Sequence, residues 1–155
     1  MTEQLSPLAL QALAIVEESG AIISANHAHP HTIRHKGRID LVTETDIAVE
    51  AFLKERLATL TPEAGFLAEE SAEDLSLPDT CWIIDPVDGT TNFAHGLPLT
   101  VTSVAYRLNG EIVLGIVNAP LLRECFIAEK GKGAWRNGER ISVSSVADCE
   151  NALVS

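Results

Sequence analysis

The sequence is poor in cysteine, in basic residues and in long apolar runs, and each shortage excludes a class of protein. Its 155 residues include three cysteines, an odd number, at positions 81, 125 and 149. This spacing offers neither a disulfide framework nor the Cys-x-x-Cys pairs of a structural zinc site. We therefore expect reduced thiols that act as small apolar packing groups in a cytoplasmic protein.

Basic residues are also scarce. The chain has 11 Lys and Arg against 22 Asp and Glu, a formal charge of −11, and the bases form no run. Such a chain repels nucleic acid phosphates and anionic membrane surfaces, so neither is expected as a partner. No apolar stretch of the roughly 18 residues needed to span a membrane is expected, and the N-terminal Met-Thr-Glu-Gln lacks the basic start of a secretory signal. An anionic substrate would need a cation beyond the side chains.

Two amphipathic helices are expected in the first 62 residues. The first begins at Ser6-Pro7, where Ser is an N-cap and Pro opens the helix, and it ends near Asn26. The second is capped by Thr43 or Thr45 and stops before Pro62. Their apolar positions recur at helical spacing: Leu13, Val16, Gly20 and Ile23 in the first, and Val49, Leu53, Leu57 and Leu60 in the second.

Short apolar segments after Pro62 predict a β-sheet. They are Gly65–Ala68, Cys81–Ile84, Leu99–Arg107, Ile112–Asn118 and Cys125–Ala128. Asn109-Gly110 and Asn137-Gly138 predict tight hairpin turns, because both central residues of such a turn need positive φ. The fold class is therefore α+β, with two long helices packed on a largely antiparallel β-sheet in one domain over residues 1–155.

Three acidic clusters fall at the ends of these elements, where function is often found. They are residues 40–46, residues 69–71 and residues 85–93. In the third, Asp85 and Asp88 stand three residues apart across a stiff Pro86 turn and can converge on one point. Neighbouring carboxylates repel unless they are protonated or bridged by a cation, and ligands made only of oxygen suit Mg²⁺.

An anion site is expected beside this cation site. Gly89 lets the backbone approach a ligand closely, and Thr90 and Thr91 offer hydroxyls and amides. Adjacent cation and anion sites are what metal-assisted phosphoryl transfer needs. Each cluster alone also fits an ordinary capped turn or a solvated strand end, so it is their combination that favours a functional site.

The segment from Trp82 to Gly96, WIIDPVDGTTNFAHG, closely resembles the signature of the inositol monophosphatase family. Other landmarks of that family follow in order: Asp40-Leu-Val-Thr43-x-Thr45-Asp46, Gly65-Phe-Leu-Ala-Glu69-Glu70-Ser71, Gly115-Ile-Val-Asn-Ala-Pro120 and Gly131-Lys-Gly-Ala134. The resemblance runs from Leu5 onward. It implies the amino-terminal half of an αβαβα sandwich and a Mg²⁺-dependent phosphomonoesterase, with Mn²⁺ as a possible substitute.

The resemblance also implies a metal-ligand set. Glu69, Asp85 and the Val87 carbonyl would hold one ion, and Asp85 with Asp88 would hold a second. Two such ions stabilise the attacking and leaving oxygens of a phosphate ester.

Further roles are implied for the water, the substrate and supporting residues. Glu69 and Thr90 would bind and polarise the attacking water, with Asp46 paired to Thr90 or to a metal-bound water. The substrate would contact Glu69, Val87, Asp88 and the amides of Gly89 and Thr90. Supporting residues would be Glu70 and a basic residue before the Asp40 motif, either Lys36 or Arg38, whose spacing differs by one residue from the family pattern.

Within the family, Asn92-Phe-Ala-His95-Gly96 favours inositol monophosphate over nucleotide 3′-phosphates and fructose 1,6-bisphosphate. No segment matches the Trp-Asp-x-Ala-Ala-Gly motif of the family's second half, so we expect the carboxy-terminal α/β half to be absent. A catalytically incomplete metal-binding or assembly module is therefore the alternative function. Apolar surface left uncovered predicts a dimer or larger homo-oligomer.

A histidine cluster, His27, His29 and His31, precedes the second helix. It could bind a transition metal, although a solvated connecting loop is the simpler interpretation. Trp82 and Trp135 are expected to be core or edge aromatics.

Overall fold

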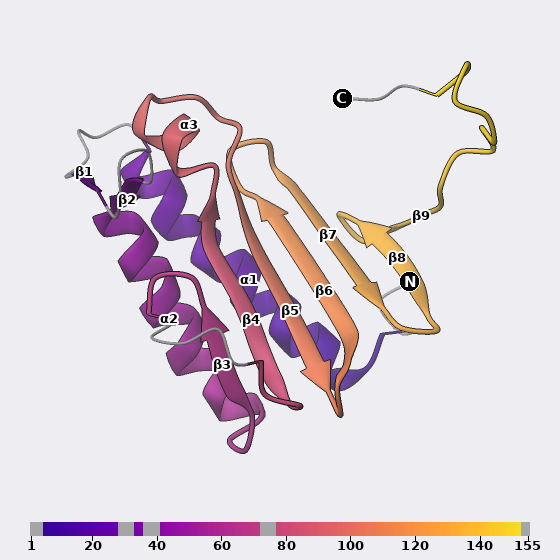
Figure 1. The fold of residues 1–155 in the computed structure, drawn as a ribbon, viewed down its shortest axis with the longest axis horizontal. Coiled ribbons are helices and arrows are strands. Elements are labelled where there is room, and N and C mark those ends of the chain that lie inside the picture. Colours follow the sequence, from indigo (N-terminus) through magenta and orange to yellow (C-terminus); the bar gives the residue numbers. More distant parts are fainter. Residues whose placement is uncertain (1–4, 28–32, 36–40, 72–76, 153–155) are drawn as a thin grey trace.

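The computed structural model describes residues 5–27, 33–35, 41–71 and 77–152, and two long helices in it cover one face of a seven-stranded sheet (Figure 1). The helices are α1 (Pro7–Asn26), α2 (Glu44–Leu60) and the short α3 (Thr90–Ala94). The sheet contains, in spatial order, β3 (Gly65–Ala68), β4 (Cys81–Asp88), β5 (Val101–Leu108), β6 (Glu111–Ala119), β7 (Glu124–Glu129), β8 (Gly133–Arg136) and β9 (Glu139–Ile141). A separate antiparallel pair joins β1 (Ile33–His35) to β2 (Leu41–Thr43).

The sheet is antiparallel except at one pair. β3 and β4 are parallel, and every other neighbouring pair of strands in the seven-stranded sheet is antiparallel. Both Asn-Gly turns have the expected positive φ values, 51° and 83° at Asn109 and Gly110, and 48° and 80° at Asn137 and Gly138. The predicted α+β class is confirmed.

Each long helix begins at the cap that the sequence offers. Ser6 Oγ accepts a hydrogen bond from Ala9 N at 3.1 Å, and Ser6 N donates to Glu129 Oε2 in β7 at 2.8 Å. Of the two candidate caps for α2, Thr43 is the cap, and it forms a capping box with Asp46. Both helices also end where the sequence predicts.

The core lies between the two helices and the sheet. α2 packs on β4, and α1 packs on β5, β6 and β7. Trp82 and Trp135 are both buried, and Trp82 Nε1 donates to Thr61 Oγ1 at 2.8 Å. The three cysteines are unpaired, but the expectation of packed thiols holds only for Cys81 and Cys125, because Cys149 is exposed.

One expectation about apolar runs was wrong. By length and composition alone, α1 is long and apolar enough to cross a membrane. In this fold, however, α1 buries a face that includes Val16 and Ile23 against the sheet. The core helix of a folded domain passes the same test, so the finding does not by itself assign a membrane span.

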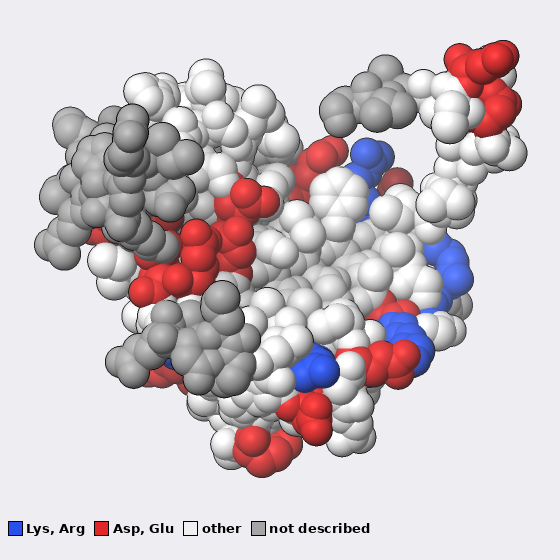
Figure 2. All heavy atoms as spheres, in the orientation of Figure 1, with Lys and Arg blue, Asp and Glu red and all other residues white. Residues whose placement is uncertain are grey.

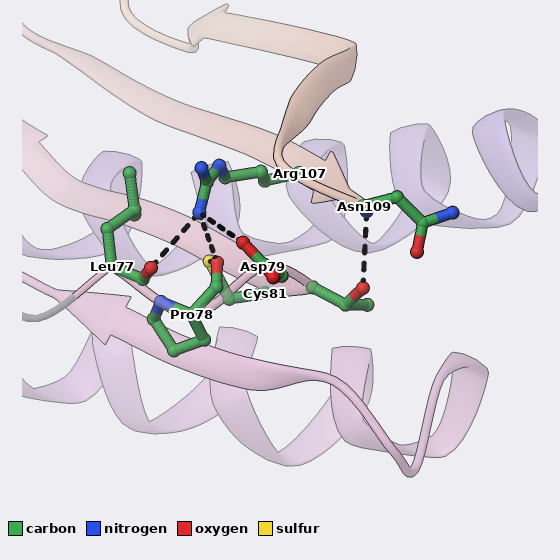
Figure 3. Close-up of polar contacts among 7 residues, drawn as sticks. Leu77, Pro78, Asp79, Cys81, Arg107 and Asn109 are labelled. Carbon is green, nitrogen blue, oxygen red and sulfur yellow. Dashed lines mark hydrogen bonds and ion pairs between the residues drawn. The ribbon is translucent and has the colours of Figure 1, made fainter.

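The described residues just before β4 are anchored at the start of that strand (Figure 3). Arg107 Nη1 donates to Leu77 O at 3.0 Å and to Pro78 O at 2.6 Å, and it lies 3.7 Å from Asp79 Oδ1. Asn109 N donates to the Thr80 hydroxyl at 3.4 Å. These contacts fix where β4 begins.

Candidate active site

The parallel pairing of β3 and β4 brings two acidic segments together. Ala68 pairs with Ile84, and Glu69 N donates to Ile84 O at 3.1 Å, so Glu69, the residue after β3, comes level with Asp85 in β4. Figure 2 shows Asp and Glu side chains gathered where β3 and β4 end. The second and third acidic clusters therefore meet, as a site requires.

The expected turn at Asp85-Pro86 is instead part of β4. The strand continues to Asp88, but its register to β5 shifts between Asp85 and Asp88. Pro86 has no N–H for the ladder, so the strand bulges there, and a bulge redirects the side chains around it. Thr102 and Thr100 hold the bulge through hydroxyl bonds to Pro86 O at 2.9 Å and Asp88 O at 2.8 Å.

Gly89 turns the chain out of β4. Its φ is 89° and its ψ is 34°, and α3 starts at the next residue. A Cβ atom at Gly89 would lie 2.8 Å from Leu99 O, so no larger residue fits. The close neighbour of Gly89 in this structure is the protein's own Leu99 carbonyl, and the approach of this backbone to a ligand stays a prediction.

Asp46 and Thr90 are paired. Thr90 Oγ1 lies 2.9 Å from Asp46 Oδ1 and 2.9 Å from Val87 O, and both of these atoms are acceptors. Asp46 is 1% exposed, and its Oδ2 accepts bonds from Thr43 N at 3.0 Å and from the Thr43 hydroxyl. This buried carboxylate therefore connects the start of α2 to the start of α3.

Asp85 has an environment that disfavours its charge. The pKa of Asp85 is raised to about 7, chiefly by burial. The charge of Glu69 and a hydrogen bond with it come next, followed by the charges of Asp88 and Asp46. A bond between two carboxyl groups needs a proton on one of them. Asp85 Oδ1 is nevertheless buried with no hydrogen-bond partner. An unpartnered oxygen among acids suits a cation.

The donor set fits a hard divalent cation. Glu69, Asp85, Asp88 and the Val87 carbonyl offer only oxygen ligands, which are those of Mg²⁺ and Ca²⁺. Within the described ranges, no three or more His, Cys, Asp and Glu side chains form a ready-made metal site. The ligand sets implied by the sequence need only two carboxylates per ion, so this finding does not conflict with them.

Not every sequence candidate can be placed, because Lys36, Arg38, His29 and His31 lie outside the described residues. His27 caps α1, and its ring centroid lies 5.7 Å from that of Phe93 in α3.

Sequence reasoning missed Glu50. This residue is 4% exposed, and its Oε2 accepts a bond from Glu70 N at 2.8 Å. Its position one helical turn after Asp46, next to the apolar Val49, was the available signal.

Comparison with known proteins identifies the family. The profile of the Inositol monophosphatase family matches residues 4–155. The chain belongs to the inositol monophosphatase family. An inositol monophosphatase from Dictyostelium discoideum is 45% identical over 148 residues, which cover 93% of this chain and 54% of that protein. The chain spans about half the length of the curated relatives it matches.

Solved structures agree with this family. A Thermotoga maritima IMPase is 38% identical with a TM-score of 0.80, covering 86% of this chain and 52% of that chain. An IMPase/NADP phosphatase complexed with Mg²⁺ and phosphate is 28% identical with a TM-score of 0.73, covering 82% and 49% of the two chains. Other family relatives are named "Fructose-1,6-bisphosphatase/inositol-1-monophosphatase" and "Nus factor SuhB". Membership of this phosphatase family therefore does not settle the substrate.

Proposed function

We propose that this chain supplies the metal-binding part of a divalent-cation-dependent phosphatase that acts on small phosphate monoesters. The observation that carries the proposal is Asp85, whose buried, unpartnered oxygen lies beside Glu69 and Asp88 and next to the Asp46–Thr90 pair. These residues form one oxygen-lined acidic edge at the ends of β3 and β4. The solved relative with Mg²⁺ and phosphate supports the same assignment.

The proposed ligands are Glu69, Asp85 and the Val87 carbonyl for one ion, and Asp85 with Asp88 for a second. When bound, Mg²⁺ supplies charge stabilisation for phosphate oxygens and lowers the pKa of water. The chain's own contribution is to hold three carboxylates together on two strand ends against their mutual repulsion.

The Thr90 hydroxyl has a defined orientation, which suits its proposed role in binding the attacking water. Its hydroxyl proton is directed to the acceptors Asp46 Oδ1 and Val87 O, so its oxygen lone pairs can accept a hydrogen bond from a water molecule. Glu69, which is exposed, is the residue we propose to accept a proton of that water. The amides of Gly89 and Thr90, at a positive-φ turn, are the proposed phosphate contacts.

Inositol monophosphate is the substrate we propose. The segment Asn92-Phe-Ala-His95-Gly96 and the names of several matched relatives support it. Nucleotide 3′-phosphates and fructose 1,6-bisphosphate are the competing substrates, and the names of two matched proteins mention fructose 1,6-bisphosphatase and NADP phosphatase.

We further propose that the protein acts in the cytoplasm as a homo-oligomer, either a dimer or a larger assembly. The support for the compartment is that Cys81, Cys125 and Cys149 are unpaired thiols. The support for association is a set of apolar residues, among them Val117 and Ala128, on the sheet face that α1 and α2 leave uncovered (Figure 1).

Phosphate release from inositol 1-phosphate, with and without Mg²⁺, tests the enzymatic proposal. We expect Mg²⁺-dependent release that Asp88→Asn lowers by about 100-fold or more. The matched control is Asp148→Asn, which removes the same charge from an exposed position near the C-terminal end of the described chain. Absence of Mg²⁺-dependent, Asp88-dependent turnover would overturn the enzymatic proposal for this polypeptide.

Calorimetric titration with Mg²⁺ or Mn²⁺ separates the alternatives. Binding without turnover would support a metal-binding or assembly module. No measurable binding would remove the metal-site assignment altogether.

A further inference from the structure

α2 holds a buried acid that the proposed chemistry does not use. Glu50 is 4% exposed, and its Oε2 accepts a hydrogen bond from the backbone N–H of Glu70 at 2.8 Å. A carboxylate is rarely buried without such partners, because its desolvation costs several kcal/mol. The bond therefore attaches the turn after β3 to α2.

Lys54, one helical turn further along α2, contacts the same turn. Its Nζ donates to Ser71 Oγ at 2.9 Å and lies 4.0 Å from Glu50 Oε1. The ammonium also lies over the Phe66 ring of β3, 6.0 Å from the ring centroid. Two side chains of α2 thus contact successive residues of the turn, Glu70 through its backbone and Ser71 through its hydroxyl.

These contacts restrict the backbone of Glu69. Its own N–H is bonded to Ile84 O in β4 at 3.1 Å, and the next N–H, of Glu70, is bonded to Glu50 in α2. The φ and ψ torsions of Glu69 lie between these two anchored amides. Because both amides are held, the direction of the Glu69 side chain is set by β4 on one side and α2 on the other.

We propose that Glu50 and Lys54 act as positioning residues that hold Glu69 against Asp85. We call these two residues the α2 clamp. The inference rests on the proposed function, because Glu69 is one of the proposed metal ligands. When both are charged, Glu69 and Asp85 repel each other, and the clamp then opposes the swing of Glu69 toward solvent. A site whose ligands are held in place before binding takes up a cation more tightly.

An ordinary surface ion pair would not explain these contacts. Exposed pairs four residues apart on a helix contribute only about 0.3–0.5 kcal/mol, and both partners normally face solvent. Glu50 instead faces the protein interior, and its closest recorded partner is the Glu70 amide rather than Lys54.

The test compares four variants of the whole chain: Glu50→Ala, Glu50→Gln, Lys54→Met and Glu55→Gln. Glu55→Gln is the matched control for the two Glu50 variants, because Glu55 is exposed on the same helix and its substitution changes the net charge by the same amount as theirs. Two quantities are measured: the Kd for Mn²⁺, from the electron paramagnetic resonance of the free ion, and hydrogen exchange of the Glu70 amide in the metal-free chain. Circular dichroism checks that each variant folds.

We expect Glu50→Ala to raise the Mn²⁺ Kd about 10-fold or more and to speed exchange of the Glu70 amide about 10-fold. Glu50→Gln keeps an acceptor for that amide, so both quantities should recover to within about threefold of the parent chain. Lys54→Met, at a partly exposed position, should raise the Kd about threefold even if Glu50→Ala fails to fold. Glu55→Gln should change neither.

Three results would overturn the inference or its basis. Faster Glu70 exchange with an unchanged Mn²⁺ Kd would show that the clamp is structural and positions nothing. Unchanged exchange in the Glu50→Ala chain would show that there is no clamp. A parent chain that binds no Mn²⁺ would overturn the proposed function instead, while the exchange experiment still decides whether Glu50 orders the turn.

Discussion

At the scale of single residues, the charged form of Asp85 that a metal ion requires is also the form that destabilises the metal-free fold. Its pKa is raised, chiefly by burial and then by Glu69, from an ordinary 3.8 to about 7. The folded chain therefore binds a proton between these pH values that the unfolded chain does not. The stabilisation from this proton is fully present below about pH 3.8 and is lost as the pH rises through about 7.

We predict that Asp85→Asn removes this pH-dependent loss of folding stability. In the metal-free parent chain, the free energy of unfolding should fall between pH 5 and pH 8 by about 1–2 kcal/mol, since solvent still screens a half-buried carboxyl. The amide introduced by the substitution has no charge to gain, so the variant should show a flatter profile. Urea unfolding at a series of pH values measures this, and Mg²⁺ should stabilise the parent chain more at pH 8 than at pH 5. Identical profiles for parent and variant would contradict the assignment.

Two glycines with the same backbone preference give a second prediction. Gly89 and Gly96 both have positive φ, 89° and 73°, but only at Gly89 would a Cβ meet a backbone atom, Leu99 O at 2.8 Å. We expect Gly96→Ala to cost about 1 kcal/mol from the backbone alone. Gly89→Ala should cost about 2 kcal/mol or more, because strain and overlap add. Denaturant unfolding compares the two, and equal losses would show that the predicted overlap is relieved by movement of the loop.

At the scale of elements, the contact of α1 with the sheet depends on a glycine inside a helix. A Cβ at Gly20 would lie 2.7 Å from Asn118 Nδ2 and 2.9 Å from Pro120 Cβ. Alanine favours the helix by about 1 kcal/mol, whereas overpacking of this kind costs about 1–3 kcal/mol. We therefore predict that Gly20→Ala destabilises the chain, and that Asn118→Ala in the same chain recovers part of the loss. A Gly20→Ala chain more stable than the parent would contradict this packing.

The connection between β3 and β4 is held at both ends for different purposes. The α2 clamp holds its start beside the site, and Arg107 holds its end at the opposite end of β4 (Figure 3). We predict that Arg107→Met lowers the free energy of unfolding by about 1–2 kcal/mol, from lost charge-assisted bonds to Leu77 and Pro78 carbonyls. The Mn²⁺ Kd should stay unchanged, because this anchor lies at the start of the strand and Asp85 lies near its end. A weakened Kd would show that the whole connection acts as one unit.

The starts of helices and the positions of turns were predictable from sequence where a few neighbouring residues determine them. The cap at Ser6, the cap at Thr43 and the two Asn-Gly turns are examples, because each is set by a few adjacent residues. Five elements were missed, namely β1, β2, α3, β8 and β9, and none exceeds five residues, so periodicity says little about them. β3 is as short, with four residues, and was predicted from its continuous apolar run instead. The strand through Asp85-Pro86 was mistaken for a turn because a bulge and a turn use the same residue types. Glu50 was missed because its function depends on β3 lying beside α2, a tertiary contact.

At the scale of the whole molecule, charged and uncharged surface regions are separated on the visible face (Figure 2). Red side chains gather at the ends of β3 and β4, while the visible middle of the sheet is largely white (Figure 2). α1 and α2 lie behind the sheet in this view (Figure 1), so this white surface is the face they leave uncovered. Cross-strand neighbours on it include Ala105, Gly115 and Ala128, and the adjacent row includes Val117 and Phe126. Self-association through this face would bring two chains of charge −11 together.

We predict that the chain forms a dimer or a larger homo-oligomer and that salt strengthens the association, because screening weakens the repulsion between two acidic chains. Val117→Asp should shift the chain toward monomer, since Val117 is 36% exposed between buried neighbours of β6 and faces away from the helices. Val143→Asp is the matched control, because Val143 is 94% exposed in the segment after β9. Light scattering across protein and salt concentrations measures the effect. A strict monomer at high concentration, or equal effects of both substitutions, would contradict association through the sheet face.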